Sequence, residues 1–325
     1  MTARLPDSTT PIIVLDLRNG SELSLPLDAG VSTVLCIGNL DGVHLGHRRL
    51  IEQTVSIARS KDATAEKVKS GAWFFSTPTR EGVSTITTVE EKLEIMRSLG
   101  LDIAFIAHFP SLRELSPSEF ATEVLAGQCA CCSVVCGYNF RYGKDGAGDA
   151  SSLKENFPGE VTVVDCVMVD GIPVSSSAIR EYISQGSVER AAKMLTRPYG
   201  VSAPVIQGKM LGRHLGFPTA NQLLPETAPV PALGVYVSLV CVDGRRYIGV
   251  TNIGHRPTVE KTQNVNCETY ILDFSSYIYD KVIRVELLTW LRPEIRFSSI
   301  SELVRTIGEN AEQAREYFRE NGVRL

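Results

Sequence analysis

The sequence predicts two domains, an α/β Rossmann-like domain followed by a mostly antiparallel β-barrel domain with a C-terminal helix. The first observation is length, because 325 residues suffice for two hydrophobic cores. The second is an alternation of strand-like and helical runs up to about residue 198, which is typical of βαβ units around a parallel sheet. The third is a series of strand-like runs with short polar or glycine turns from about residue 200 onward.

The elements of the first half follow from β-rich runs and helix-start signals. The expected strands are 32–38, 72–76, 102–109, 132–140 and 161–169. The expected helices are 47–63, 88–100, 116–127 and 187–195. Thr88 with Glu91, and Ser116 with Glu119, are spaced as capping boxes, and Pro117 suits a first helical position.

The elements of the second half are mostly strands. The expected strands are 234–244, 245–254, 266–274 and 281–291. A closing helix is expected over 298–322, opened by a Ser299/Glu302 box and stopped near Gly322. We place the domain boundary between residues 198 and 199, because Pro198 and Gly200 follow the helical run there.

Composition excludes several classes of protein. The formal net charge of -4 argues against nucleic-acid binding, because no basic excess is available to displace phosphate counterions. The N-terminus lacks a hydrophobic signal core and no apolar run approaches a membrane span, so we expect a cytoplasmic protein without a membrane partner. The eight cysteines are expected to be reduced and mostly buried, although four crowd into "CACCSVVC". The oligomeric state stays open.

The segment GNLDGVHLGH, residues 38–47, lies where a strand-like run turns into a helix. A helix N-terminus at the carboxyl end of a parallel strand presents N–H groups to an anion. Gly42 and Gly46 would let the backbone approach a phosphate, while His44 and His47 could donate hydrogen bonds to its oxygens. The alternative is a pair of surface histidines without a role.

Longer segments carry a family resemblance over nearly the whole chain. Residues 38–47, 137–149 (GYNFRYGKDGAGD) and 174–198 resemble the N-terminal module of the bacterial bifunctional riboflavin kinase/FMN adenylyltransferase (FAD synthetase) family. The rest resembles its kinase module through GRHLGFPTANQLL (212–224), GVYVSLV (234–240), GVTNIGHRPT (249–258), CETYILDF (267–274) and LRPEIRFSSISEL (291–303). The resemblance implies phosphorylation of riboflavin to FMN by ATP, then adenylylation of FMN to FAD with release of pyrophosphate.

For the kinase half, the resemblance implies that Thr219 and Asn221 hold Mg²⁺ against ATP, and their oxygens are hard ligands suited to that ion. We expect both in a turn-rich loop, LGFPTAN. Glu268, on an expected strand, matches the family's general base, and the alternative is an edge-strand carboxylate facing solvent. Further nucleotide contacts are expected at Gly212, Arg213, Gly216 and Pro218, and flavin contacts at Arg292, Glu294 and Phe297.

For the adenylyltransferase half, the resemblance implies an in-line attack by the FMN phosphate on ATP without a covalent enzyme intermediate. His44 and His47 would contact the ATP phosphates as catalytic residues, with Arg180 as a forked donor. The nucleotide-binding positions are then Gly38, Asn39, Asp41, Gly42, Gly46, Asn139, Ser175, Ser176 and Arg180. An ordinary serine N-cap is the alternative for the "VSSSAIR" segment.

One departure from the family pattern leaves alternatives open. The family carries a Pro-His-Pro signature after the second strand, whereas "WFFSTPTR" has Pro78 but no histidine. The chain could therefore be a riboflavin kinase with a degenerate adenylyltransferase module. A flavin-binding sensor without turnover is a third reading, although a pure binder would need no base at Glu268.

Overall fold

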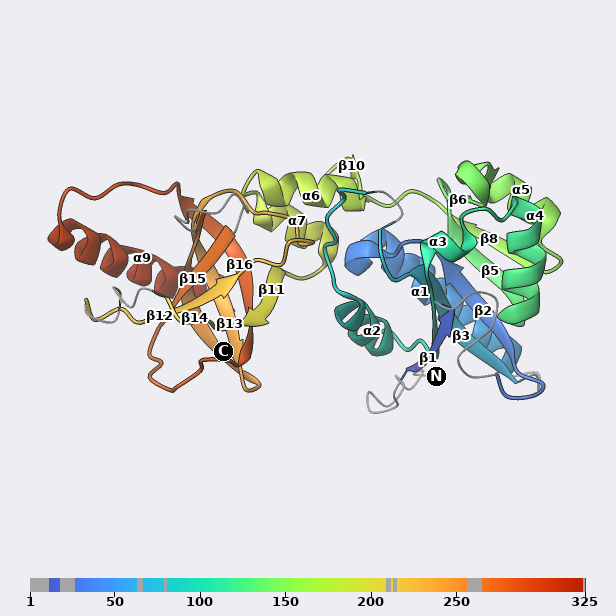
Figure 1. Cartoon of the computed structure of the whole chain (residues 1–325), viewed down its shortest axis with the longest axis horizontal. Helices are drawn as coiled ribbons and strands as arrows, with labels where there is room; N and C mark the ends of the chain where they lie inside the picture. The colour runs from blue at the N-terminus through green and yellow to red at the C-terminus, as the bar shows by residue number, and fades with distance from the viewer. Residues whose placement is uncertain are drawn as a thin grey trace. The chain divides into compact units, whose positions relative to one another are not determined.

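The computed structural model describes residues 12–17, 27–62, 67–78, 81–208, 212, 215–255, 265–323 and 325. The chain divides into two compact units, residues 1–176 and 177–325 (Figure 1). Within the described residues no helix combines the length and the apolar character that a membrane crossing requires.

The first unit is built on a six-stranded parallel sheet in the order β1-β4-β3-β2-β5-β8. Its strands are β1 (Ile13–Leu17), β2 (Ser32–Ile37), β3 (Val68–Phe75), β4 (Ile103–Ala107), β5 (Cys131–Gly137) and β8 (Glu160–Val164). From β2 the chain continues to one side through β3 and β4, then crosses to β5 and β8 on the other side. The strand order therefore reverses between β2 and β5, where open α/β sheets bind ligands.

Helices cover both faces of this sheet because successive strand residues point to opposite sides. Val34 and Cys36 pack with the helices α1 (Leu45–Asp62) and α2 (Val89–Ser98). Leu35 and Ile37 pack on the other face with residues of η2 (Phe120–Gln128) and α5 (Ala150–Asn156). The smaller elements are η1 (Asp41–Val43), α3 (Phe109–Leu112), α4 (Pro117–Glu119), η3 (Lys144–Gly146) and the hairpins β6/β7 (Arg141–Tyr142, Gly148–Asp149) and β9/β10 (Met168–Val169, Ile172–Pro173).

Most expected elements of the first unit are confirmed, but the expected strand 161–169 ends at Val164, and Met168–Val169 pairs instead in the small β9/β10 hairpin. Both capping boxes form, at Thr88 before α2 and at Ser116 before α4. The expected α-helix 116–127 is α-helical only at its start and continues as the π-helix η2, where the Cys129 N–H donates to the carbonyl of Val124. The edge strand β1 was not expected; it pairs with β4 from Ile13 onward.

The second unit is a curled half-barrel of six antiparallel strands in the order β11-β16-β13-β14-β15-β12. The strands are β11 (Tyr199–Pro204), β12 (Thr219–Leu223), β13 (Gly234–Val242), β14 (Arg245–His255), β15 (Val265–Ile271) and β16 (Val282–Arg292). An antiparallel bridge between Ile206 and Asn221 links the chain after β11 to β12, which curls the sheet. The mostly antiparallel β-barrel domain is thereby confirmed.

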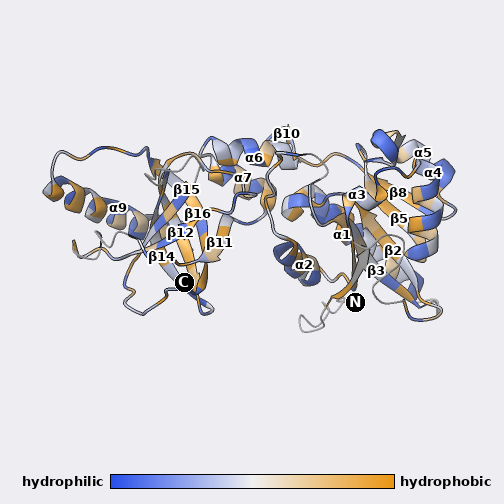
Figure 2. Cartoon of the chain, in the orientation of Figure 1, coloured by the Kyte–Doolittle hydropathy of each residue, from blue (hydrophilic) through white to orange (hydrophobic). Residues whose placement is uncertain are grey.

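Among the described residues, the helices α6 (Ser176–Ser184), α7 (Val188–Leu195) and α9 (Ile300–Glu320) complete the second unit. The C-terminal helix α9 packs Ala311, Ala314 and Phe318 against apolar residues of the sheet, and its two faces differ in hydropathy (Figure 2). The Ser299 hydroxyl caps it as expected, but the Glu302 carboxylate accepts from the N–H and hydroxyl of Ser298, so only half of the box forms.

The other two helices, α6 and α7, lie at the unit boundary. The Ala232 N–H donates to the carbonyl of Ile183, and the Thr289 hydroxyl donates to Glu189. These bonds explain why the compact unit begins near α6, whereas we expected a domain boundary after residue 198.

Candidate functional site

The first candidate site is the turn from β2 into α1, at the point where the strand order reverses. Gly42 has a φ of 81°, and the turn also holds Leu40 in the left-handed region with φ 48°. This conformation brings the chain from the end of the strand back to the start of α1 within a few residues. The predicted residues Gly38, Asn39, Asp41, Gly42, His44, Gly46 and His47 all lie on this turn or on the first turn of α1.

Asp41 holds the turn in place. Its side chain is buried, and its Oδ1 atom accepts hydrogen bonds from the N–H groups of Ile86, at 2.9 Å, and Thr87, at 3.3 Å. The Gly42 N–H donates in return to the Thr87 hydroxyl at 3.0 Å. The Ser176 hydroxyl donates to the Asp41 carbonyl at 2.9 Å, so two segments predicted to bind nucleotide meet here.

The two histidines of the motif are stacked. Their ring centroids lie 3.6 Å apart with an interplanar angle of 16°. His44 precedes the first residue of α1, and its Nδ1 accepts the backbone N–H of His47 at 3.3 Å, so His44 caps the helix. A Cβ atom on Gly46 would come within 3.2 Å of the His44 ring. Glycine at position 46 therefore leaves room for the capping ring.

Electrostatics make His47 a neutral imidazole. Burial, followed by the charges of His44 and Lys92, lowers the pKa of His47 well below its ordinary value of 6.5. The Nδ1 atom of His47 is buried without a hydrogen-bond partner among the described residues. A neutral imidazole has one N–H donor, so His47 offers one donor to a ligand.

Lys92 is a residue of this site that the sequence analysis missed. It belongs to α2 and is 5% exposed, which is rare for lysine. Its Nζ donates to the Asn39 carbonyl at 3.2 Å and lies 5.2 Å from the centroid of the Phe74 ring. Lys92 thus places a positive charge beside the turn.

The remaining predicted residues of the first half are distributed over both units. Asn139 is exposed just after β5, and β5 pairs with β2, so Asn139 lies at the same edge of the sheet as the turn. Ser175 is half-buried directly before Ser176. Arg180 is half-buried on α6 and belongs to the second unit.

The second candidate site is a polar row across three strands of the half-barrel. Asn221 on β12 pairs with Glu268 on β15, and Glu268 pairs in turn with Asn252 on β14. Directly paired residues of antiparallel strands share one face. The neighbours Cys267 and Thr269 point to the opposite face and are buried, whereas Glu268 is exposed. Glu268 thus lies on a strand with partners on both sides, not on an edge strand.

Thr219 and Asn221 lie on strand β12, so our expectation of a turn-rich loop was wrong for them. The strand forms because Ala220 and Gln222 are buried inside the half-barrel and every residue of β12 pairs with β15. The Asn221 Nδ2 lies 3.3 Å from the Thr219 carbonyl and 3.4 Å from its hydroxyl. The two side chains are therefore neighbours.

The turn before β12 holds the other predicted nucleotide contacts. The Gly212 carbonyl accepts from the N–H groups of Leu215, at 3.1 Å, and Phe217, at 2.8 Å. Gly216 has a φ of 86°, which suits glycine, and Pro218 is exposed. Arg213 lies outside the described residues.

The predicted flavin contacts follow β16. Arg292 donates through Nε and Nη2 to the Asn310 side chain of α9, at 3.1 and 2.9 Å, and its guanidinium lies 5.9 Å from the Phe297 ring centroid. Glu294 accepts from the Asn252 side chain at 3.1 Å, which ties it to the polar row. Arg292, Glu294 and Phe297 therefore lie near one another and connect to the row at Asn252.

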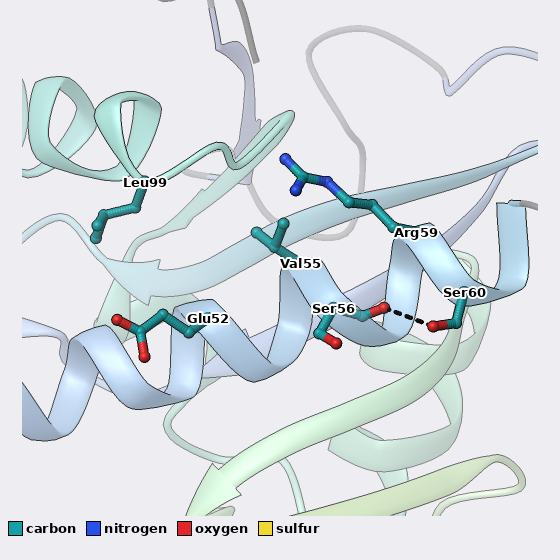
Figure 3. A pocket seen from close by; sticks show the side chains of 6 residues that line it. All are labelled: Glu52, Val55, Ser56, Arg59, Ser60 and Leu99. Carbon is teal, nitrogen blue, oxygen red and sulfur yellow. Dashed lines mark hydrogen bonds between the residues drawn. The ribbon is translucent and has the colours of Figure 1, made fainter. Parts of the chain in front are cut away.

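A shallow groove elsewhere in the first unit holds none of the predicted residues. It lies between α1 and the end of α2 (Figure 3). Its lining residues are Glu52, Val55, Ser56, Arg59, Ser60 and Leu99. The cysteines are also outside both sites: all eight are free and five are buried, as expected, and burial raises the pKa of Cys131 to about 12.

Comparisons with known proteins cover both halves. A family model described as FAD synthetase matches residues 29–178, and one described as riboflavin kinase matches residues 195–318. A bifunctional riboflavin kinase/FMN adenylyltransferase from Listeria monocytogenes is 33% identical over 297 residues, covering 89% of this chain and 93% of that protein. Its counterpart from Bacillus subtilis is 32% identical over 88% of this chain and 92% of that protein.

A solved structure has the same fold. A crystal structure described as a macrolide-efflux protein from Streptococcus pneumoniae has a TM-score of 0.83 and 27% identity, and the match covers 94% of this chain and 99% of that one. Fold and sites together define a phosphate-transferring enzyme with a nucleotidyltransferase half and a kinase half. The chain belongs to the family of bifunctional riboflavin kinase/FMN adenylyltransferases, which confirms the predicted family and both activities.

Proposed function

We propose that riboflavin is phosphorylated at the polar row of the second unit and that FMN is adenylylated at the His44–His47 turn of the first unit. The observation that carries the proposal is the register of β12 with β15, which sets Asn221 opposite Glu268 on one face of the sheet. A metal-binding amide and a proton-accepting carboxylate on one face could act on the same phosphoryl transfer.

The residues at the row fit Mg²⁺. The Thr219 hydroxyl and the Asn221 amide oxygen are hard oxygen ligands, and their side chains are neighbours on β12. Asn266 donates a hydrogen bond to the Asn221 amide oxygen. An amide oxygen has two lone pairs, so one is left for a metal ion. Thr219 and Asn221 would hold Mg²⁺, and the ion would supply positive charge that neutralises the phosphates of ATP.

Glu268 is suited to the proton transfer of the kinase step. Its carboxylate is exposed, so a hydroxyl group can reach it, and Asn266 donates to one of its oxygens at 2.7 Å. The carboxylate would accept the proton of the riboflavin 5'-hydroxyl as that oxygen attacks the γ-phosphorus of ATP and ADP leaves. Arg292, Glu294 and Phe297 would position the flavin near the row.

The first site is suited to charge stabilisation. The FMN phosphate is already an anion, so its attack on the α-phosphorus of ATP needs no strong base. The Nδ1 of His44 accepts a hydrogen bond, so its proton is on Nε2, where it can be donated to a phosphate oxygen. Neutral His47, the cation Lys92 and the start of α1 would stabilise the charge that develops before pyrophosphate leaves.

Two broader assignments accompany these roles. We keep residues 1–198 as the adenylyltransferase domain and 199–325 as the riboflavin kinase domain, with riboflavin, FMN and ATP as small-molecule partners. The eight free cysteines support a reducing compartment, and we propose the cytoplasm.

The experiment compares both reactions in three purified proteins: wild type, His47→Ala and His108→Ala. His108 follows β4 and is not part of the β2–α1 turn, so His108→Ala serves as the histidine control. We expect His47→Ala to lower the rate of FAD formation from FMN by on the order of 10²-fold while riboflavin phosphorylation persists. Equal FAD rates in wild type and His47→Ala would show that the histidine pair is not part of the adenylyl-transfer site. Absence of FAD in the wild type would show that the chain is a riboflavin kinase with a degenerate adenylyltransferase module.

A further inference from the structure

We propose that Asn266 is a positioning residue of the riboflavin kinase site, where one side-chain amide holds both the Glu268 carboxylate and the Asn221 amide oxygen. The inference rests on the proposed roles of Glu268 and Asn221. Asn266 lies two residues before Glu268 on β15, so both side chains are on the same face of the sheet.

The contacts are specific to the site. The Asn266 Nδ2 donates to Glu268 Oε1 at 2.7 Å and to Asn221 Oδ1 at 3.3 Å. A side-chain NH₂ group has two hydrogens, and here one serves each acceptor. Both donors of Asn266 therefore go to residues assigned to the reaction.

Burial makes this arrangement rigid. Asn266 is 8% exposed, and its Oδ1 atom is buried without a hydrogen-bond partner among the described residues. A buried acceptor without a partner is unfavourable for folding, and such groups call for an explanation. The contacts of Nδ2 explain why the oxygen lies on the buried side. If the amide were turned over, its oxygen would face the Glu268 carboxylate instead.

Gln222 shows how a buried amide with a structural role differs. It also has a buried side-chain oxygen without a described partner. Its Nε2, however, donates to the backbone carbonyls of Ala203, at 2.7 Å, and Ile283, at 3.0 Å, so it joins strands β11, β12 and β16. Gln222 thus holds the sheet together, whereas Asn266 holds two side chains of the proposed site.

The functional consequence follows from the exposure of Glu268. An exposed glutamate samples several rotamers, and a general base must lie within hydrogen-bond reach of the hydroxyl it deprotonates. A fixed donor on one carboxylate oxygen restricts that motion. Partners that orient catalytic ligands in this way are typically worth 10- to 100-fold in activity or metal affinity.

The test is a double-mutant cycle on riboflavin phosphorylation at saturating Mg²⁺-ATP, with circular dichroism and thermal unfolding of each variant as the control for folded protein. We expect Asn266→Leu to lower kcat 10- to 100-fold with the KM for riboflavin within about 2-fold. In a Glu268→Gln background, the same substitution should lower kcat by clearly less than it does with Glu268 present, because only the contact with Asn221 remains to be lost. Gln222→Met is the matched control and should leave kcat of the folded protein unchanged.

Each other outcome has a defined meaning. A wild-type kcat in Asn266→Leu, or an equal loss in the Glu268→Gln background, would overturn the inference while leaving Glu268 as the base. A wild-type kcat in Glu268→Gln alone would overturn the proposed function instead. If Asn266→Leu does not fold, the near-isosteric Asn266→Asp replaces it in the cycle, because Asp also lacks the two donors, and the same comparisons decide.

Discussion

Acidification should destabilise the first unit through His47. The folded-state pKa of His47 lies well below the unfolded value of about 6.5, so unfolding takes up a proton at mildly acid pH. The folding stability that depends on neutral His47 is fully present above pH 6.5. It is lost as the pH falls from 6.5 toward the pKa of His47 in the folded protein. Between pH 7.5 and pH 5.5 this one group should lower the free energy of unfolding by about 1 kcal/mol.

The assay is urea denaturation at both pH values, followed by tryptophan fluorescence. The chain has two tryptophans, and a Trp290→Phe background leaves Trp73, which is 3% exposed in the core of the first unit. In that background we compare the protein that keeps His47 with the His47→Gln variant. Carboxylates titrate in both proteins, so their effect on stability cancels in the difference. The protein with His47 should lose about 1 kcal/mol more unfolding free energy than the variant.

Lys92→Met supplies a second arm of the same experiment. Its charge contributes to the low pKa of His47, so its removal should raise that pKa and reduce the loss of stability on acidification. An identical pH dependence in the His47 and His47→Gln proteins would refute the reasoning, because His47 would then not be held neutral by the fold.

Three further predictions concern the two sites. Gly46→Ala should lower FAD formation from FMN by on the order of 10-fold, because the added Cβ crowds the His44 ring; an unchanged FAD rate would show that the position of the ring does not matter for the transfer. Thr219→Ala and Asn221→Ala should each raise the Mg²⁺ concentration for half-maximal riboflavin phosphorylation by on the order of 10-fold, and an unchanged Mg²⁺ titration would exclude both from metal binding. Arg292→Lys should raise the KM for riboflavin several-fold, because lysine lacks the guanidinium fork, and an unaltered KM would place that residue outside the flavin site.

Local signals predicted much of the fold. The capping boxes at Thr88 and Ser116 predicted the starts of two helices because the interaction is local and has a fixed spacing. Strand β12 was missed because Pro218 precedes it and polar residues occupy both of its faces, so no period of two in hydrophobicity is visible. Its identity as a strand depends on pairing with β15, which only the tertiary structure supplies.

The residues of the candidate sites also differ in whether the sequence could predict them. His44 and His47 could be predicted because they fall in a compact motif at a strand-to-helix turn. Lys92 and Asn266 could not, because a lysine in a helix and an asparagine in a strand are usually solvent-facing. Only the packing of α2 and β15 shows that both are buried beside a site.

The central claim is that two separate sites carry two reactions, and Glu268→Gln tests it most directly. The variant keeps the shape of the side chain but removes the proton acceptor. Supplied with riboflavin, ATP and Mg²⁺, it should form FMN at least about 10²-fold more slowly than wild type, whereas supplied with FMN it should form FAD at the wild-type rate. Loss of both activities together, or retention of riboflavin phosphorylation, would contradict the account.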